Sequence, residues 1–91
     1  MKYEFDWDRG NESKSLEKHG IGNPETESVF DDPNLYMSPD EKHSLTEKRY
    51  ICIGKSVLGR VLFIVFTRRM DYIRVISSRP ANAKNRMLYE N

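Results

Sequence analysis

The stretch Arg60–Pro80, RVLFIVFTRRMDYIRVISSRP, decides the fold of this chain. Its first run, Val61–Phe66, contains no polar residue. This run is too short to span a membrane and too rich in Val, Ile and Phe for a surface helix. We therefore expect a central strand that is buried on both faces of a sheet.

The second run of this stretch alternates in character and predicts a strand with two different faces. Ile73, Val75 and Ser77 should point to one side of the sheet, and the residues between them to the other. The polar segment Arg68–Asp71 separates the two runs. Together they predict an antiparallel hairpin with that segment as its connection.

Two helices are expected before these strands, and capping signals mark their ends. Asp8 is a candidate N-cap for a helix over Arg9–His19, and Gly20 follows its last residue. Asn23-Pro24 suits the start of a second helix, with Asn as the cap. Asp31-Asp32-Pro33 should end it, because the residue before proline avoids the helical conformation.

The remaining segments complete an α+β fold. Alternating aromatic and charged side chains predict a short strand over Met1–Trp7. Strands are also expected at Leu35–Met37 and Lys48–Lys55, with a polar loop, Ser38–Thr46, between them. A last helix should span Asn82–Tyr89, capped by its first residue. The expected architecture is an antiparallel sheet of four strands plus the short N-terminal strand, two N-terminal helices and one C-terminal helix.

The length of 91 residues predicts a single domain, 1–91. The one cysteine, Cys52, cannot form an internal disulfide and should be a small buried thiol, so we expect a cytoplasmic protein. No N-terminal apolar run predicts a signal peptide, and no window of about 18 apolar residues predicts a membrane helix. No membrane partner is therefore expected.

The net charge of +1 hides a strong asymmetry along the chain. Residues 1–45 contain 5 Lys or Arg and 11 Asp or Glu, whereas residues 46–91 contain 10 and 3, so the halves carry −6 and +7. Seven of the ten cations in the second half are arginines, the better phosphate ligands. This half predicts a polyanion partner, although the charges could also serve only solubility.

The sequence lacks a glycine-rich phosphate loop, a cysteine pair and a nucleophile elbow. His19 and His43 alone are too few for a metal site, so we expect neither a metal nor a cofactor. The scattered His, Glu, Lys and Arg residues suit one cofactor-free reaction, cleavage of RNA by its own 2′-hydroxyl. That reaction needs a base, an acid and cations around the phosphate.

Each candidate for this chemistry also has a simpler explanation. Lys18-His19 could only stabilise the C-terminus of a helix. His43 and Glu47 could belong to a solvated loop, and Arg49 and Arg60 could be ordinary strand-end arginines. Arg79, which precedes Pro80 and a helix start, is the strongest candidate for an anion site.

Short motifs follow one another along nearly the whole chain. They are Trp7-Asp8, Lys18-His19-Gly20, Val29-Phe30-Asp31-Asp32-Pro33, Asp40-x-x-His43-Ser44-x-x-Glu47-x-Arg49, Ile53-Gly54-x-Ser56, Gly59-Arg60, Ile73-Arg74-Val75-Ile76-Ser77-Ser78-Arg79, Arg86 and Tyr89-Glu90. In the order and spacing of these motifs, the chain resembles the BrnT toxins.

This resemblance implies a RelE-like fold and a ribonuclease toxin of a type II toxin–antitoxin pair, which cuts RNA without a metal and slows translation. It implies a partner similar to the BrnA antitoxins, small ribbon-helix-helix proteins that neutralise the toxin and bind operator DNA. The implied catalytic residues are Lys18, His19, Glu47, Arg49, Arg60 and Arg79. Arg68, Arg69 and Arg74 are expected to bind the RNA substrate.

Three positions depart from the pattern of this family. Ser15 replaces a frequent Asn, and Ser78 stands where Ala is usual before the arginine. Asn85 stands where Glu usually completes a capping box with residue 82. We expect the loss of that box to cost the last helix about 0.5–1 kcal/mol.

Two other functions fit parts of the same sequence. A non-catalytic module could use the basic half to bind nucleic acid or an acidic protein without cutting it. A small hydrolase could use Cys52 as its nucleophile, although the predicted burial of this thiol argues against it.

Overall fold

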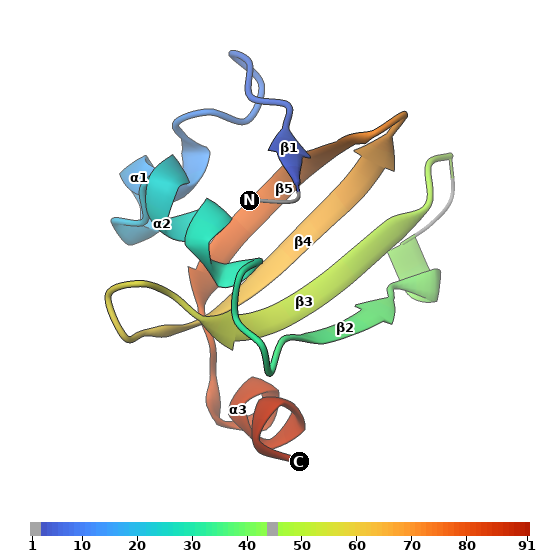
Figure 1. Ribbon diagram of the computed structural model, residues 1–91. Helices are drawn as coiled ribbons and strands as arrows, with labels where there is room; N and C mark the ends of the chain where they lie inside the picture. Colours follow the sequence, from blue (N-terminus) through green and yellow to red (C-terminus); the bar gives the residue numbers. More distant parts are fainter. Residues whose placement is uncertain (1–2, 44–45) are drawn as a thin grey trace.

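The computed structural model describes residues 3–43 and 46–91 (Figure 1). The chain forms a five-stranded mixed sheet with the order β1-β5-β4-β3-β2. Its strands are β1 (Glu4–Phe5), β2 (Tyr36–Pro39), β3 (Arg49–Lys55), β4 (Val61–Arg69) and β5 (Tyr72–Pro80). The helices of the described part are α1 (Lys14–His19), α2 (Asn23–Val29), α3 (Ala83–Glu90) and the short 3₁₀ helix η1 (Glu41–His43).

The predicted α+β class and the four-stranded meander are confirmed. Neighbouring strands from β2 to β5 pair antiparallel, and β1 adds to the edge of β5 in the parallel sense. Four residues of the predicted elements, Met1 and Lys2 of the first strand and Ser44 and Leu45 of the polar loop, lie outside the described residues.

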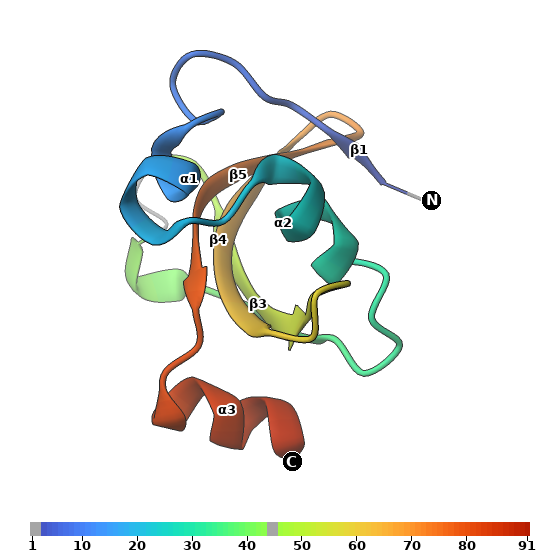
Figure 2. The ribbon, with the colours of Figure 1, turned by 90° about the vertical axis from the view of Figure 1, so that its left-hand side faces the viewer.

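The apolar run in β4 is buried on one face only, so the prediction of burial on both faces is wrong. Leu62, Ile64 and Phe66 are buried, whereas Val61 and Val65 on the other face are half-buried. Figure 2 shows the reason: α2 lies across one face of the curved sheet, while α3 lies at the sheet's lower end, where it contacts β3. The second face therefore keeps an open area.

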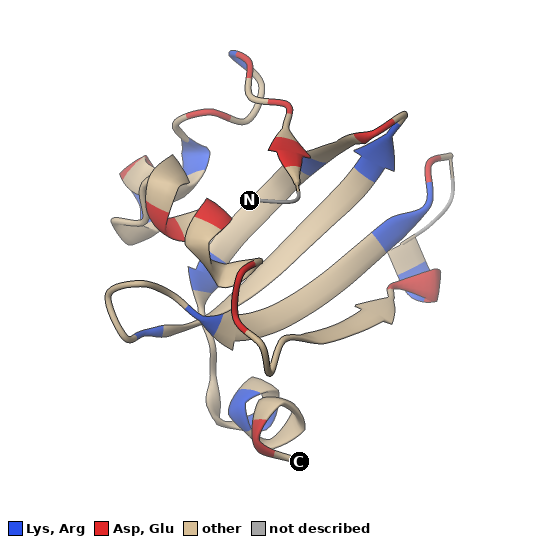
Figure 3. Ribbon diagram, viewed as in Figure 1, with Lys and Arg blue, Asp and Glu red and all other residues tan. Residues whose placement is uncertain are grey.

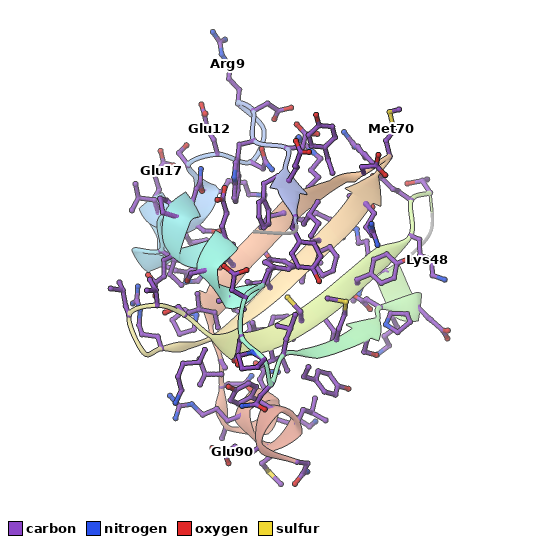
Figure 4. All side chains as sticks on the ribbon, viewed as in Figure 1. Arg9, Glu12, Glu17, Lys48, Met70 and Glu90 are labelled. Atoms are coloured by element: carbon purple, nitrogen blue, oxygen red, sulfur yellow. The ribbon has the colours of Figure 1, made fainter. Side chains whose placement is uncertain are left out.

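The turn of the central hairpin is shorter than predicted. Arg68 and Arg69 continue β4, and only Met70 and Asp71 connect it to β5. Met70 adopts a left-handed conformation with φ of 57°, which a two-residue turn between twisted strands demands. Its side chain projects from the hairpin tip (Figure 4).

A β-bulge in β5 reverses the predicted alternation of its side chains. Val65 pairs with Ser77 but Phe66 pairs with Val75, so Ile76 is an extra residue in β5. The order of faces switches at such a bulge. The prediction that Ser77 shares a face with Val75 is therefore wrong.

Beyond the bulge, Ser78 takes the buried position. It has no exposed surface, and its Oγ accepts a hydrogen bond of 2.9 Å from the hydroxyl of Thr26 in α2. Ser77 and Arg79 lie on the opposite face, with Val65 and Phe63, and are half-buried. One inserted residue thus moves the side chains at the end of β5 to the opposite faces of the sheet.

The hydrophobic core lies between α2 and the covered face of the sheet. Phe30 is its centre and contacts Phe5 and Phe66 edge to face, with ring centroids 5.2 and 5.4 Å apart. Cys52 is fully buried in this core, as predicted, and burial raises the pKa of its thiol. A thiol that stays protonated is a poor nucleophile.

The first helix is much shorter than predicted and Asp8 does not cap it. Asp8 Oδ1 instead accepts a hydrogen bond from the backbone N–H of Gly10, at 2.8 Å. Asn11 is buried and its Nδ2 donates to the carbonyl oxygen of Val75, at 2.9 Å. This bond gives a partner to a backbone carbonyl group of β5 that lies past the two residues paired with β1. An unpaired strand edge at this place could attract another strand.

The other helix ends agree better with the sequence. Gly20 ends α1 with φ of 70°, as expected. In α2, Gly22 rather than Asn23 occupies the N-cap position. The capping box of α3 is present, so its predicted loss is wrong. Asn85 takes over the role of the usual Glu in this box, because its amide Oδ1 accepts a hydrogen bond from the backbone N–H of Asn82, at 3.1 Å.

Candidate active site

A pocket of about 240 Å³ lies between α1 and the end of β5. Its lining residues are Lys14, Ser15, Lys18, His19, Ser77 and Arg79. The structure therefore brings together three of the predicted site residues, Lys18, His19 and Arg79. Two lysines, an arginine and an imidazole in one pocket form a strongly cationic site.

Local structure explains why these side chains meet. Gly20 ends α1 directly after Lys18 and His19, and cations are favourable in the last turn of a helix. The backbone N–H of Ser78 donates to Ser15 Oγ at 3.0 Å, which ties α1 to the edge of β5. The bulge at Ile76 buries Ser78 on the α2 side and leaves Arg79 to line the pocket.

Neutral groups hold the guanidinium of Arg79. Its Cζ lies 4.3 Å from the centroid of the Phe63 ring, which is a cation–π contact. Its Nη1 donates to the carbonyl oxygen of Pro80 and to Oδ1 of Asn85, both at 3.1 Å. Among the described residues, no carboxylate forms an ion pair with Arg79. Its positive charge is therefore available to a ligand.

Arg60 lies next to this pocket, but a carboxylate compensates its charge. Arg60 Nη2 is 2.6 Å from Oε1 of Glu25, a residue with 7% exposure, and Nε donates to Oε2 at 2.9 Å. The hydrogen bond from Arg60, helped by that from Ser56, lowers the pKa of Glu25. Nη2 also reaches the carbonyl oxygen of Gly20 at 3.4 Å, so Arg60 is close to the end of α1.

Glu47 and Arg49 lie toward the other end of the sheet. Glu47 Oε2 is 2.9 Å from Nε of Arg69, and this hydrogen bond lowers the pKa of Glu47. Arg49 pairs with Thr67, whereas Phe63 is level with Arg79. Four residues along β4 separate the two levels, a distance of roughly 13 Å. The structure does not bring these two residues to the pocket.

The three arginines predicted to bind RNA lie at or near the hairpin tip. Arg74 forms ion pairs of 2.9 Å with Asp8 and 3.5 Å with Asp6, and its hydrogen bond lowers the pKa of Asp8. Arg69 pairs with Glu47, as described above. Arg68 lines a separate small pocket beside Tyr50. Figure 3 shows basic residues at both ends of the β4–β5 hairpin.

Sequence reasoning missed four residues that line or support the pocket: Lys14, Ser15, Ser77 and Asn85. Lys14 precedes Lys18 by four residues, so a helix places both on one face. That spacing was a usable signal. The position of Ser77 depends on the bulge, which the sequence does not mark.

Within residues 3–43 and 46–91, no group of three or more His, Cys, Asp or Glu side chains could hold a metal ion. In the same part of the chain, no helix has the length and apolar character needed to cross a membrane.

The fold and the pocket define a small α+β protein with a cationic pocket that includes an imidazole, a set of side chains that suits an anionic ligand. Residues 7–85 match the family described as the ribonuclease toxin, BrnT, of type II toxin-antitoxin systems. The chain belongs to this family, which confirms the resemblance read from its motifs. Membership implies a ribonuclease toxin and an antitoxin partner. A comparison with curated proteins finds no match.

Proposed function

We propose that this protein is a metal-independent endoribonuclease toxin with a RelE-like fold, and that it cleaves RNA in the pocket between α1 and β5. The observation that carries the proposal is the pocket itself, where the uncompensated Arg79 lies with Lys18 and His19. Family membership supports the ribonuclease activity. Cleavage of messenger RNA would slow translation.

The chemistry follows from the side chains of this pocket. The 2′-hydroxyl oxygen attacks the adjacent phosphorus, the bond from phosphorus to the 5′-oxygen breaks, and the products are a 2′,3′-cyclic phosphate and a 5′-hydroxyl. Arg79 and Lys18 bind the non-bridging oxygens, where negative charge grows in the transition state. His19 moves the proton, because an imidazole ring can both accept and donate one.

Other predicted residues take different parts in this proposal. Arg60 fixes the loop after β3 to α2 through Glu25 and contributes only weakly to the charge of the pocket. The pairs at the hairpin tip reduce the net charge that Arg69 and Arg74 offer to RNA. The chemistry is assigned to Lys18, His19 and Arg79.

The proposed partner is an antitoxin similar to the BrnA proteins, a ribbon-helix-helix dimer that neutralises the toxin in the cytoplasm. Operator DNA would be bound through the antitoxin rather than by this chain. The support for a partner is membership of a type II toxin–antitoxin family. A small basic ribbon-helix-helix protein in the neighbouring reading frame would identify it.

The test is to produce the protein without an antitoxin and to measure growth arrest and RNA cleavage. Arg79→Ala and His19→Ala should weaken both. His43→Ala is a matched control, because His43 is exposed and pairs with Asp40 instead of lining the pocket. Unchanged activity in both pocket variants would refute the site. RNA binding without any cleavage product would favour the non-catalytic binding module.

A further inference from the structure

We infer that Asn85 is a positioning residue that orients Arg79 and so couples the C-terminal helix to the pocket. This inference rests on the proposed function and names a residue that none of the sequence motifs assigns to the site. Asn85 lies in the first turn of α3 and is itself half-buried. It does not line the pocket. It can act on RNA only through Arg79.

One amide oxygen performs two tasks here. Asn85 Oδ1 accepts from the backbone N–H of Asn82 and from Nη1 of Arg79, at 3.1 Å in each case. In return, Asn82 Oδ1 accepts from the backbone N–H of Asn85 at 2.8 Å. The same capping box that starts α3 therefore also fixes one corner of the guanidinium.

The corner that is fixed determines which edge remains free. Both hydrogen bonds of Arg79 come from Nη1, and the Phe63 ring covers one flat face of the guanidinium. Within the described residues, no hydrogen bond involves Nε or Nη2 of Arg79. These two atoms form a two-pronged edge that can bind two phosphate oxygens together. Holding Nη1 thus presents this edge in a defined direction.

The far end of α3 is anchored as well, so Asn85 is a firm support. The Tyr89 hydroxyl donates to Asp32 Oδ2 at 2.6 Å, and the same oxygen accepts from the backbone N–H of Lys55 at 2.7 Å. The hydrogen bond to Asp32 raises the pKa of Tyr89 to about 12, so the hydroxyl keeps the proton that it donates at neutral pH. Hydrogen bonds of Asn85 and Tyr89 thus connect both ends of α3 to the rest of the fold.

Two variants separate the role in positioning from the role in capping. Asn85→Ala removes both bonds of the amide oxygen, whereas Asn82→Ala removes the other half of the capping box and leaves Asn85 Oδ1 in contact with Arg79. Single-turnover RNA cleavage should slow at least about tenfold in Asn85→Ala, because small misplacements of a binding group reduce rates strongly. It should stay within about twofold in Asn82→Ala. Equal losses in the two variants would overturn the inference.

A double-variant comparison adds a second criterion. Asn85 acts through Arg79, so Asn85→Ala should have no further effect on cleavage in a protein that already carries Arg79→Ala. An additional loss of tenfold in that background would show an independent role and would also overturn the inference.

A measurement that needs no nuclease activity keeps this inference separate from the proposed function. The ¹⁵N relaxation of Arg79 Nε should report an ordered side chain in the unsubstituted protein and in Asn82→Ala, and a mobile one in Asn85→Ala. If the unsubstituted protein cleaves no RNA, the proposed function fails, and the relaxation data alone decide whether Asn85 orients Arg79. Equal order in all three proteins would reject that orientation.

Discussion

The two ends of the β4–β5 hairpin carry arginines in opposite chemical settings. At the tip, carboxylates of Glu47 and Asp8 compensate two of the three arginines, Arg69 and Arg74. At the exit, the end where the chain leaves β5 for α3, Arg79 is held without compensation of its charge. Its contacts there are the Phe63 ring, the carbonyl oxygen of Pro80 and the amide oxygen of Asn85. Both kinds of contact fix the side chain, but only the second leaves the positive charge for a phosphate. The partner of an arginine therefore predicts its use better than its position in the sequence does.

The same comparison changes the meaning of the charge asymmetry. The second half of the chain carries +7 and the first half −6, yet the fold pairs Arg60 with Glu25 and Arg74 with Asp6 and Asp8. These ion pairs join residues far apart in the chain. The basic half is therefore not a continuous surface for RNA, whereas three cations outside these ion pairs, Lys14, Lys18 and Arg79, line one pocket.

The largest effect should come from removing the uncompensated arginine. Arg79→Ala should slow RNA cleavage at least about a hundredfold, or about 2.7 kcal/mol in the activation free energy, because it removes a cation from the developing charge. Arg69→Ala, which removes a compensated and exposed arginine, should stay within about threefold. Single-turnover cleavage of one RNA by both variants measures the difference. Similar losses in the two would end the distinction between the hairpin ends.

Much of this fold could be predicted from local patterns, whereas the difference between the arginines at the two ends of the hairpin could not. The apolar run Val61–Phe66 indicated the central strand, and Gly20 correctly marked the end of α1. These are signals within a few residues of the feature that they predict. The expectation that Lys18, His19 and Arg79 belong to one site followed only from the family resemblance and from their residue types.

The bulge and the ion pairs carry no comparable signal. Ile76 has the β-branched side chain of any strand residue, so nothing indicated that it would be the extra residue in β5. An ion pair such as Arg74 with Asp8 joins residues 66 positions apart and depends on the finished fold. The short α1 likewise depends on Asn11, whose buried amide serves the edge of a strand near the opposite end of the chain.

A carboxylate at position 85 would make the exit resemble the tip. Asn85→Asp keeps an acceptor of the same length for Arg79 but adds a negative charge to it. RNA affinity should fall about fivefold, and the slope of log K against log salt should become shallower by up to about 0.7, the value for one phosphate contact with a single strand. Binding titrations at several salt concentrations measure both. An unchanged slope would show that compensation by a carboxylate does not matter here.

Compensated arginines should serve stability rather than RNA binding, and Arg60 offers the clearest case. The pKa of Glu25 is lowered from its ordinary 4.5 in the folded protein. The pair therefore contributes stability above about pH 4.5, and this contribution is lost as the pH falls through the lower, folded pKa. Glu25→Gln removes the ion pair and should lower Tm by about 5 °C at pH 7. The effect is no larger because solvent reaches part of Arg60 and screens the pair.

The sign of the pH effect distinguishes this ion pair from general destabilisation. Between pH 7 and pH 3, the unsubstituted protein should lose more Tm than Glu25→Gln, because the variant has no carboxylate to protonate at this position. Thermal unfolding followed by circular dichroism across this range measures it. Parallel curves for the two proteins would mean that the ion pair contributes no stability.

The smallest effect should come from freeing an arginine at the tip. Glu47→Gln removes the carboxylate that compensates Arg69. Six residues along β4 separate Arg69 from Phe63, the residue level with Arg79, so the freed charge lies roughly 20 Å from the pocket. The screening length in physiological salt is only about 8 Å. Cleavage of a dinucleotide in the pocket should therefore not change, whereas a long single-stranded RNA should bind about twofold more tightly. Faster dinucleotide cleavage would contradict the separation of the two ends, because it would mean that a charge at the tip acts on the phosphate beside Arg79.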